Sequence, residues 1–116
     1  MSVKRIEDID LAQNQYKALS ELRERLFSEF EVEGLILYGS VVRGEADEES
    51  DIDLLIITPM PLTRPARHKI TDMVFEVNLH HDTNFSTLVV DHNSWTSGVM
   101  SVLPLHDEIH AEGIAL

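Results

Sequence analysis

The hydrophobic positions at the start of the chain recur every three or four residues, which is the spacing of an amphipathic helix. This pattern predicts one helix over residues 7–31, stopped by Gly34 and packed on a sheet. The apolar positions that define its buried side are Ile9, Ala12, Tyr16, Leu19, Leu22, Leu26, Phe27 and Phe30.

Two continuous apolar runs follow, and neither has a helical period. Residues Leu35–Tyr38 and Asp51–Thr58 are short and rich in Leu and Ile, as is typical of strands buried on both faces. Between them, residues 40–43 predict a single helical turn and residues 45–50 a charged, exposed loop. The first strand is expected to be central in its sheet.

The remainder of the chain alternates again between turn signals and periodic segments. The predicted elements are a proline loop at 59–65, a helix at 66–81, a strand at 85–90, a short helix around Trp95, and a helical turn at 105–112 with Gly113 as its C-cap. This order predicts an α+β or α/β fold in which helices cover one side of a small mixed sheet.

Composition narrows the function classes. The 116 residues carry 21 acidic and nine basic side chains, for a net charge of −12, so direct binding of nucleic acid is not expected. The absence of cysteine excludes disulfides and thiolate zinc sites. No apolar run approaches the roughly 18 residues of a membrane span, and the N-terminus lacks the apolar core of a secretory signal. A cytoplasmic protein is therefore expected.

The segment that joins the two buried strands carries the candidate chemistry. Gly39-Ser40 ends the first strand, and Asp51 and Asp53 open the second. Residues two apart on a strand face the same side, so both carboxylates can point to one place beside the Gly-Ser turn. Such a turn offers backbone N–H groups to phosphate, and paired carboxylates suit Mg²⁺. The segment predicts a site for a metal-bound polyphosphate; the alternative is a strand with a solvated acidic loop.

The same residues resemble a known signature. GSVVRGEADEESDIDLLI, with Gly39-Ser40 separated by ten residues from Asp51-x-Asp53, is similar to the minimal nucleotidyltransferases of the DNA polymerase beta superfamily. The resemblance covers about residues 9–116, although its specific part is 38–57. It implies a single nucleotidyltransferase domain over residues 1–116.

The resemblance implies transfer of a nucleoside monophosphate, AMP from ATP, in a Mg²⁺-dependent reaction. It assigns the metal and catalytic roles to Asp51 and Asp53. The nucleotide-binding residues that it implies are Gly39, Ser40, Arg43 and Ser50. Whether Arg43 contacts phosphate or packs away from it is left open by the sequence.

One departure from the family pattern affects activity. The family generally has a third carboxylate on the later strand, and here Asn84 lies near that position, with Asp82 and Asp91 on either side of the strand. An asparagine adds no charge and is a poor general base. Either the enzyme uses Asn84 or Asp82 as the third ligand, or the protein binds nucleotide without turnover.

The acceptor is expected on another chain, because a 116-residue domain has little room for an acceptor pocket. Minimal forms of this family are often paired with a HEPN-domain toxin, which the nucleotidyltransferase adenylylates as its antitoxin, and the acidic charge suits a basic partner. A homo-oligomer is the other option. A third hypothesis, a zinc enzyme using His106 and His110, is the remotest of the three, since Asp107 stands where the zincin motif requires Glu; zinc content would decide it.

Overall fold

The computed structural model describes residues 5–47 and 50–116. In chain order the elements are η1 Ile6–Asp8, α1 Gln13–Glu29, β1 Gly34–Tyr38, α2 Ser40–Arg43, β2 Ile52–Thr58, α3 Arg64–His81, β3 Phe85–Asp91, α4 His92–Thr96, η2 Val99–Val102, α5 Pro104–Glu112 and β4 Ile114–Ala115, where η marks a 3₁₀ helix.

The strands form one mixed sheet in the order β3-β2-β1-β4. Strand β1 pairs antiparallel with both β2 and β4, whereas β3 runs parallel to β2 and is reached through the crossover helix α3. The predicted fold, a small mixed sheet with helices, is confirmed, and β1 is central as expected. The continuous apolar runs of β1 and β2 reflect burial on both faces of the sheet.

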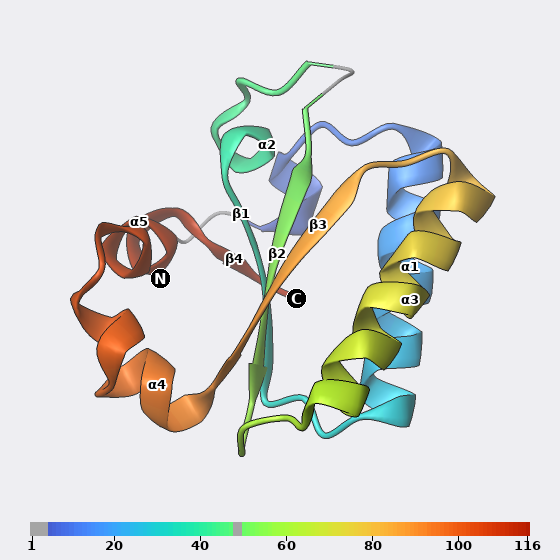
Figure 1. The fold of residues 1–116 in the computed structure, drawn as a ribbon. Coiled ribbons are helices and arrows are strands. Elements are labelled where there is room, and N and C mark those ends of the chain that lie inside the picture. Colours follow the sequence, from blue (N-terminus) through green and yellow to red (C-terminus); the bar gives the residue numbers. More distant parts are fainter. Residues whose placement is uncertain (1–4, 48–49) are drawn as a thin grey trace.

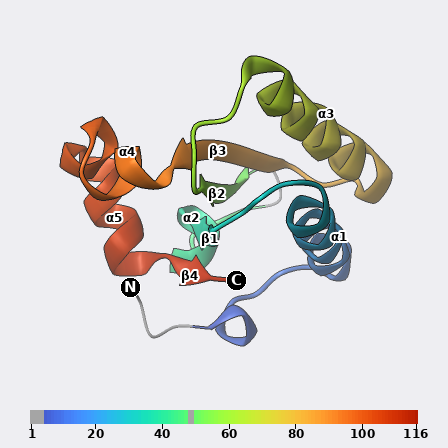
Figure 2. The ribbon, with the colours of Figure 1, turned by 90° about the horizontal axis from the view of Figure 1, so that it is seen from below.

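Helices cover both faces of the sheet, as Figures 1 and 2 show: α1 and α3 lie on one side, and α4 and α5 on the other. The prediction of a single helical side is therefore wrong. Alternate strand residues fill two separate clusters, with Leu37 and Leu54 facing α1 and α3, and Ile36 and Leu55 facing α4 and α5. The second cluster also contains Trp95, which the sequence had no means to place on a face.

The first helix is shorter than predicted. Residues 7–31 divide into η1, an extended segment and α1, which ends at Glu29. Ile9 and Leu11 are buried although they precede α1 and lie in an extended segment. Ala12, Tyr16 and Phe27 are exposed instead of buried, and Gly34 starts β1 and does not stop the helix.

The other helix ends follow local chemistry. Helix α3 starts two residues before the predicted Ala66, because Pro65 is acceptable in the first turn and the Thr63 side chain accepts a hydrogen bond from the Ala66 N–H. Gly113 ends α5 as predicted, although its φ of −63° is not left-handed. The residues after it form β4, a strand that the sequence pattern did not predict. No helix in the described part of the chain is both long and apolar enough for a membrane crossing.

Candidate nucleotide site at the end of β1

The turn after β1 has a backbone conformation that only glycine adopts readily. Gly39 has φ +87° and ψ −157°, and it connects Tyr38, the last residue of β1, to Ser40, the first of α2. The Val42 N–H donates to the Gly39 carbonyl oxygen at 3.1 Å, which closes the turn. The turn thus leaves Ser40 at the start of α2, directly after β1.

The carboxylate of Asp53 lies directly against this turn. A Cβ atom placed on Gly39 would be only 2.5 Å from Asp53 Oδ2, so a side chain there would collide with the carboxylate. Asp53 faces Tyr38 across the antiparallel β1–β2 pair, which fixes it at the end of β1. Asp51 is two residues earlier and exposed. The structure therefore brings Asp53 to the Gly-Ser turn, as the spacing indicated.

The electrostatics of this corner disfavour additional negative charge. Partial burial raises the pKa of Asp53 above its usual value, and the Asp51 carboxylate raises it further, while Arg43 partly offsets both. Burial and the nearby Asp53 and Glu108 carboxylates also raise the pKa of Tyr38. Carboxylates that repel one another and are only partly solvated form a donor set that suits a divalent cation.

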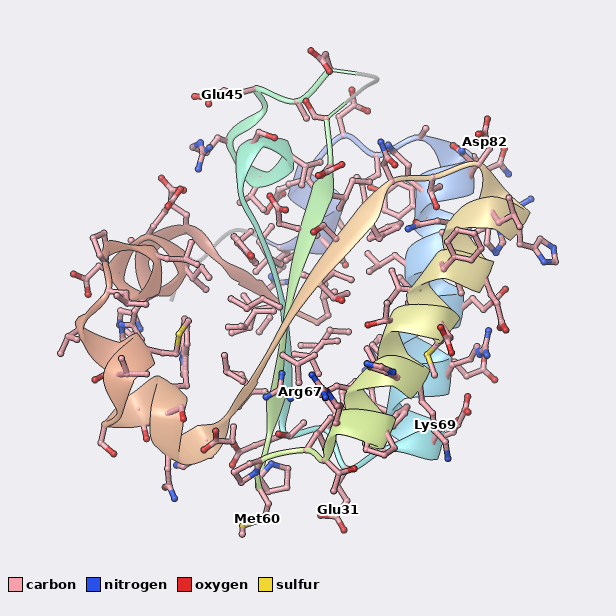
Figure 3. The ribbon with its side chains drawn as sticks, viewed as in Figure 1. Glu31, Glu45, Met60, Arg67, Lys69 and Asp82 are labelled. Carbon is pink, nitrogen blue, oxygen red and sulfur yellow. The ribbon has the colours of Figure 1, made fainter. Side chains whose placement is uncertain are left out.

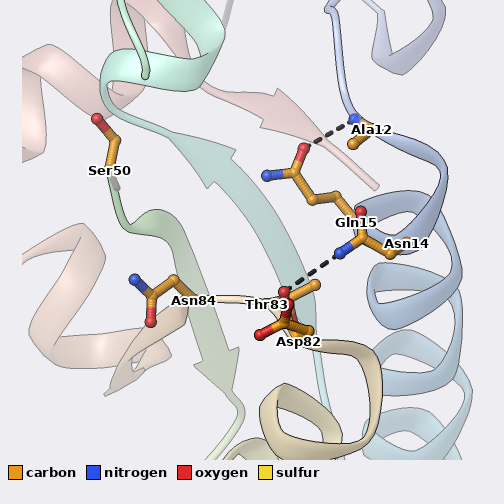
Figure 4. Close-up of a pocket in the computed structure, with 7 residues that line it drawn as sticks. All are labelled: Ala12, Asn14, Gln15, Ser50, Asp82, Thr83 and Asn84. Carbon is orange, nitrogen blue, oxygen red and sulfur yellow. Dashed lines mark hydrogen bonds between the residues drawn. The ribbon is translucent and has the colours of Figure 1, made fainter. Parts of the chain in front are cut away.

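Ser50 closes the acidic loop instead of pointing freely into the site. Its hydroxyl donates to Asp47 Oδ1 at 3.0 Å and accepts from the Asp47 N–H at 3.1 Å. Ser50 also lines a polar cavity of about 430 Å³ between the loop and the adjacent ends of α1 and α3, shown in Figure 4. The other residues that line this cavity are Ala12, Asn14, Gln15, Asp82, Thr83 and Asn84.

The parallel pairing of β2 and β3 shows which residue stands across from Asp53. Ser86 is the register partner of Asp53, so it stands across from the carboxylate on the same face of the sheet. Asn84 precedes β3, where its carbonyl accepts from the Ile52 N–H, and Asp82 caps α3 on the α1–α3 side of the molecule (Figure 3). Neither of the two predicted substitutes is the register partner of Asp53, and no sequence signal pointed to Ser86.

Arg43, which the sequence left open, packs onto α5. Its Nε donates to Glu45 at 3.2 Å, and its Nη1 donates to Glu108 at 2.8 Å and to Glu112 at 3.0 Å. The pKa of Arg43 lies above its ordinary range, chiefly because of the hydrogen bonds to Glu112 and Glu45. The two α5 residues are one helical turn apart, but no sequence signal linked them to Arg43.

The ring of His106 lies beside those of Trp95 and His110. The His106 ring lies 4.4 Å from the Trp95 ring, centroid to centroid, and 6.2 Å from that of His110. Within residues 5–47 and 50–116, no cluster of three or more His, Asp or Glu side chains could hold a metal ion. In the described part of the chain, Asp51 and Asp53 are therefore not joined by a third carboxylate or imidazole in a cluster that could hold a cation.

Comparison with known protein families shows which family carries this combination of a Gly-Ser turn and two aspartates. The family described as nucleotidyltransferase domain matches residues 19–102, which include β1, the Gly-Ser turn and both aspartates. The chain belongs to this nucleotidyltransferase family.

Two proteins of Methanocaldococcus jannaschii that carry the provisional name protein adenylyltransferase are similar in sequence. One is 42% identical over 59 residues, which cover 49% of this chain but only 40% of that protein. The other is 34% identical over 68 residues, or 59% of this chain and 69% of that protein. The chain thus spans less than half of the longer relative.

Solved nucleotidyltransferase structures share the fold. A crystal structure from Sulfolobus solfataricus, also provisionally named a nucleotidyltransferase, has a TM-score of 0.55 at 20% identity and covers 89% of this chain and 82% of its own. A chain from a mutant of the toxin–antitoxin MntA–HpeT has a TM-score of 0.52 at 18% identity and covers 92% of this chain and 72% of its own. At these identities the likeness establishes the α+β fold alone.

Proposed function

We propose that this nucleotidyltransferase transfers AMP from Mg-ATP to a hydroxyl group of a partner protein. The single observation that carries the proposal is the contact of the Asp53 carboxylate with the Gly39 turn, with the Asp51 carboxylate near enough to raise the pKa of Asp53. The names of the similar proteins from M. jannaschii support an adenylyl group as the one transferred.

In this proposal the turn and the two aspartates have separate roles. Gly39 and Ser40 bind the triphosphate through backbone N–H groups and the Ser40 hydroxyl, while Ser50 holds the loop that leads into β2. Asp51 and Asp53 are the residues that would hold Mg²⁺, which supplies charge neutralisation for the phosphates when bound.

The transfer itself needs positioning more than covalent chemistry from the protein. The acceptor oxygen forms a bond to the α-phosphorus, the bond from that phosphorus to the bridging oxygen breaks, and pyrophosphate leaves. The acceptor loses its proton in the process. The Gly39 turn would hold the phosphates beside Asp53, and the acceptor hydroxyl has to approach in line with the leaving pyrophosphate.

A specific observation favours a second candidate function, a nucleotide-binding antitoxin without turnover. The position across from Asp53 holds Ser86, whose hydroxyl is neither charged nor a useful general base. Turnover separates the two functions: pyrophosphate release that depends on Asp53 supports the transferase, and tight nucleotide binding without release supports the binding module.

Nucleotide binding is expected to require a divalent cation. Triphosphate approaching Asp51 and Asp53 adds negative charge to a corner where carboxylates already repel one another. Calorimetry of ATP with Mg²⁺ should therefore show binding that disappears in EDTA. Equal affinity for ATP under both conditions would show that the two aspartates do not hold a metal ion for the nucleotide.

We further propose that the acceptor is a basic helical protein, of the HEPN type, that pairs with this chain as a toxin with its antitoxin. The charge of −12 favours a positively charged surface, and a fold neighbour comes from a toxin–antitoxin pair. A homo-oligomer is the alternative assembly. We expect the site of action to be the cytoplasm.

The partner proposal predicts salt-dependent association. Co-purification from the native source should yield a basic protein, and mass spectrometry should detect AMP added to one of its side chains. The association rate should fall by about tenfold or more between low and physiological salt, because long-range attraction is screened. A chain that purifies alone and modifies only small molecules would leave a free-standing transferase.

A further inference from the structure

Arg43 connects two elements that are far apart in the sequence: α2, which follows β1, and α5, which precedes β4. Arg43 ends α2, the helical turn that follows Gly39, and its Nη1 donates to Glu108 and Glu112 of α5. Glu112 is the last residue of α5 and is followed by Gly113 and then β4. The ion pairs thus connect the candidate nucleotide-binding turn to the C-terminal helix.

Glu112 has little freedom to move, because the residues after it are held on the sheet. A Cβ atom on Gly113 would lie 2.5 Å from the Ile109 carbonyl oxygen and 2.6 Å from Ile36 Cγ2, so the backbone of this residue is in close contact with α5 and β1. The next residue, Ile114, pairs with Leu37 of β1. A closed ring of contacts results: β1, the Gly39 turn, Arg43, Glu112, β4 and back to β1.

We propose that Arg43, Glu108 and Glu112 are positioning residues, which fix the Gly39–Ser40 turn to α5 through this ring and do not contact the nucleotide. The inference rests on the proposed function, because the turn that is positioned is the one assigned to the triphosphate. It also replaces the sequence-based assignment of Arg43 to nucleotide binding.

The charge around the guanidinium opposes a phosphate contact. Arg43 carries one positive charge, and its three partners Glu45, Glu108 and Glu112 carry three negative charges. Phosphate placed on this arginine would have to approach three carboxylates. The same carboxylates suit a structural role, because Glu108 and Glu112 belong to α5 and hold the Arg43 guanidinium against that helix.

The two roles give opposite signs when the glutamates are neutralised. If Arg43 binds phosphate, Glu108→Gln with Glu112→Gln frees the guanidinium and removes two repelling charges, so Mg-ATP should bind more tightly. If Arg43 instead anchors the turn to α5, the same double variant loosens the turn. Mg-ATP should then bind about tenfold more weakly, in the range found for supporting residues around a site.

Glu45 provides the matched control. It contacts the same guanidinium but lies two residues away on the chain, so Glu45→Gln removes a charge without breaking the bridge to α5. This variant should change Mg-ATP affinity by no more than about twofold, as is usual for an exposed pair. Adding the Glu108→Gln and Glu112→Gln changes to Arg43→Ala should cause no further loss.

The experiment uses calorimetry with Mg-ATP and with Mg-tripolyphosphate, together with hydrogen exchange of the nucleotide-free protein. We expect the double variant to stay folded by circular dichroism, to bind both probes more weakly, and to show faster exchange at residues 40–44. Tighter or unchanged binding by the double variant, or unchanged exchange at 40–44, overturns the inference. If the wild type binds neither probe, the proposed function fails. The hydrogen-exchange rates at residues 40–44 still decide whether Arg43 anchors the turn to α5.

Discussion

Asp53→Asn is expected to reduce AMP transfer by at least about 100-fold while the protein stays folded. The variant keeps the shape of the side chain against Gly39 but loses one of the two charges assigned to the cation. Loss of a supporting residue around a metal typically costs 10–100-fold, so loss of a direct ligand should cost more. Pyrophosphate release with Mg-ATP and the partner protein measures the effect. A fully active variant would exclude Asp53 as a ligand.

The same substitution should stabilise the metal-free protein at neutral pH. The folded-state pKa of Asp53 is raised above 3.8, so its ionisation opposes folding, and this cost is complete once the pH exceeds the raised pKa. The free energy of unfolding of Asp53→Asn should therefore exceed that of the wild type at neutral pH. The difference should shrink as the pH falls below 3.8, where Asp53 is protonated in both states. Urea denaturation across this range tests the sign.

Gly39→Ala is expected to damage the site as severely. Alanine at φ +87° and ψ −157° costs about 1–3 kcal/mol of backbone strain, and its Cβ would lie 2.5 Å from Asp53 Oδ2. The carboxylate or the turn has to move, and a displacement of about 1 Å at a reacting site can cost 100-fold in rate. We expect transfer to fall by about that factor, with a measurable loss of thermal stability.

Gly44→Ala distinguishes backbone strain from the collision with Asp53 as the cause of the lost activity. Gly44 also has a positive φ, +73°, but no atom outside its chain neighbours lies within 4 Å of a Cβ placed there. This variant should lose about 1–2 kcal/mol of stability through backbone strain and retain most of its transfer activity. If both alanine variants lose activity equally, strain alone explains the loss and the contact with Asp53 is unimportant.

The sequence predicted the central part of the fold because its signals there are local. The runs Leu35–Tyr38 and Ile52–Ile57 are buried on both faces along most of their length, so their residues are apolar except Tyr38 and Asp53, which pair with each other next to Gly39. Gly39 marks a backbone that other residues avoid, and the spacing of Asp51 and Asp53 follows from the pleat of one strand. These features depend on residues that are close together in the chain, which is why the sequence could predict that Asp53 lies beside the Gly-Ser turn.

The elements that were wrong depend on contacts made elsewhere. Ile9 was counted in the first helix because it lies three residues before Ala12, but it reaches the core from an extended segment, as Leu11 does. Strand β4 is two residues long, and only its pairing with β1 makes it a strand. A spacing pattern cannot show which face a short segment will cover, so α4 and α5 on the second face were not anticipated.

The sequence by itself determined that a glycine turn and the Asp53 carboxylate meet at the end of two buried strands, since both belong to one short stretch of the chain. The tertiary structure decided which residue stands across from Asp53 and what Arg43 contacts. The parallel register puts Ser86 opposite Asp53, and α5 brings Glu108 and Glu112 to Arg43 from 65 and 69 residues away. Register and helix docking are set by packing of the whole sheet, and no local spacing encodes them.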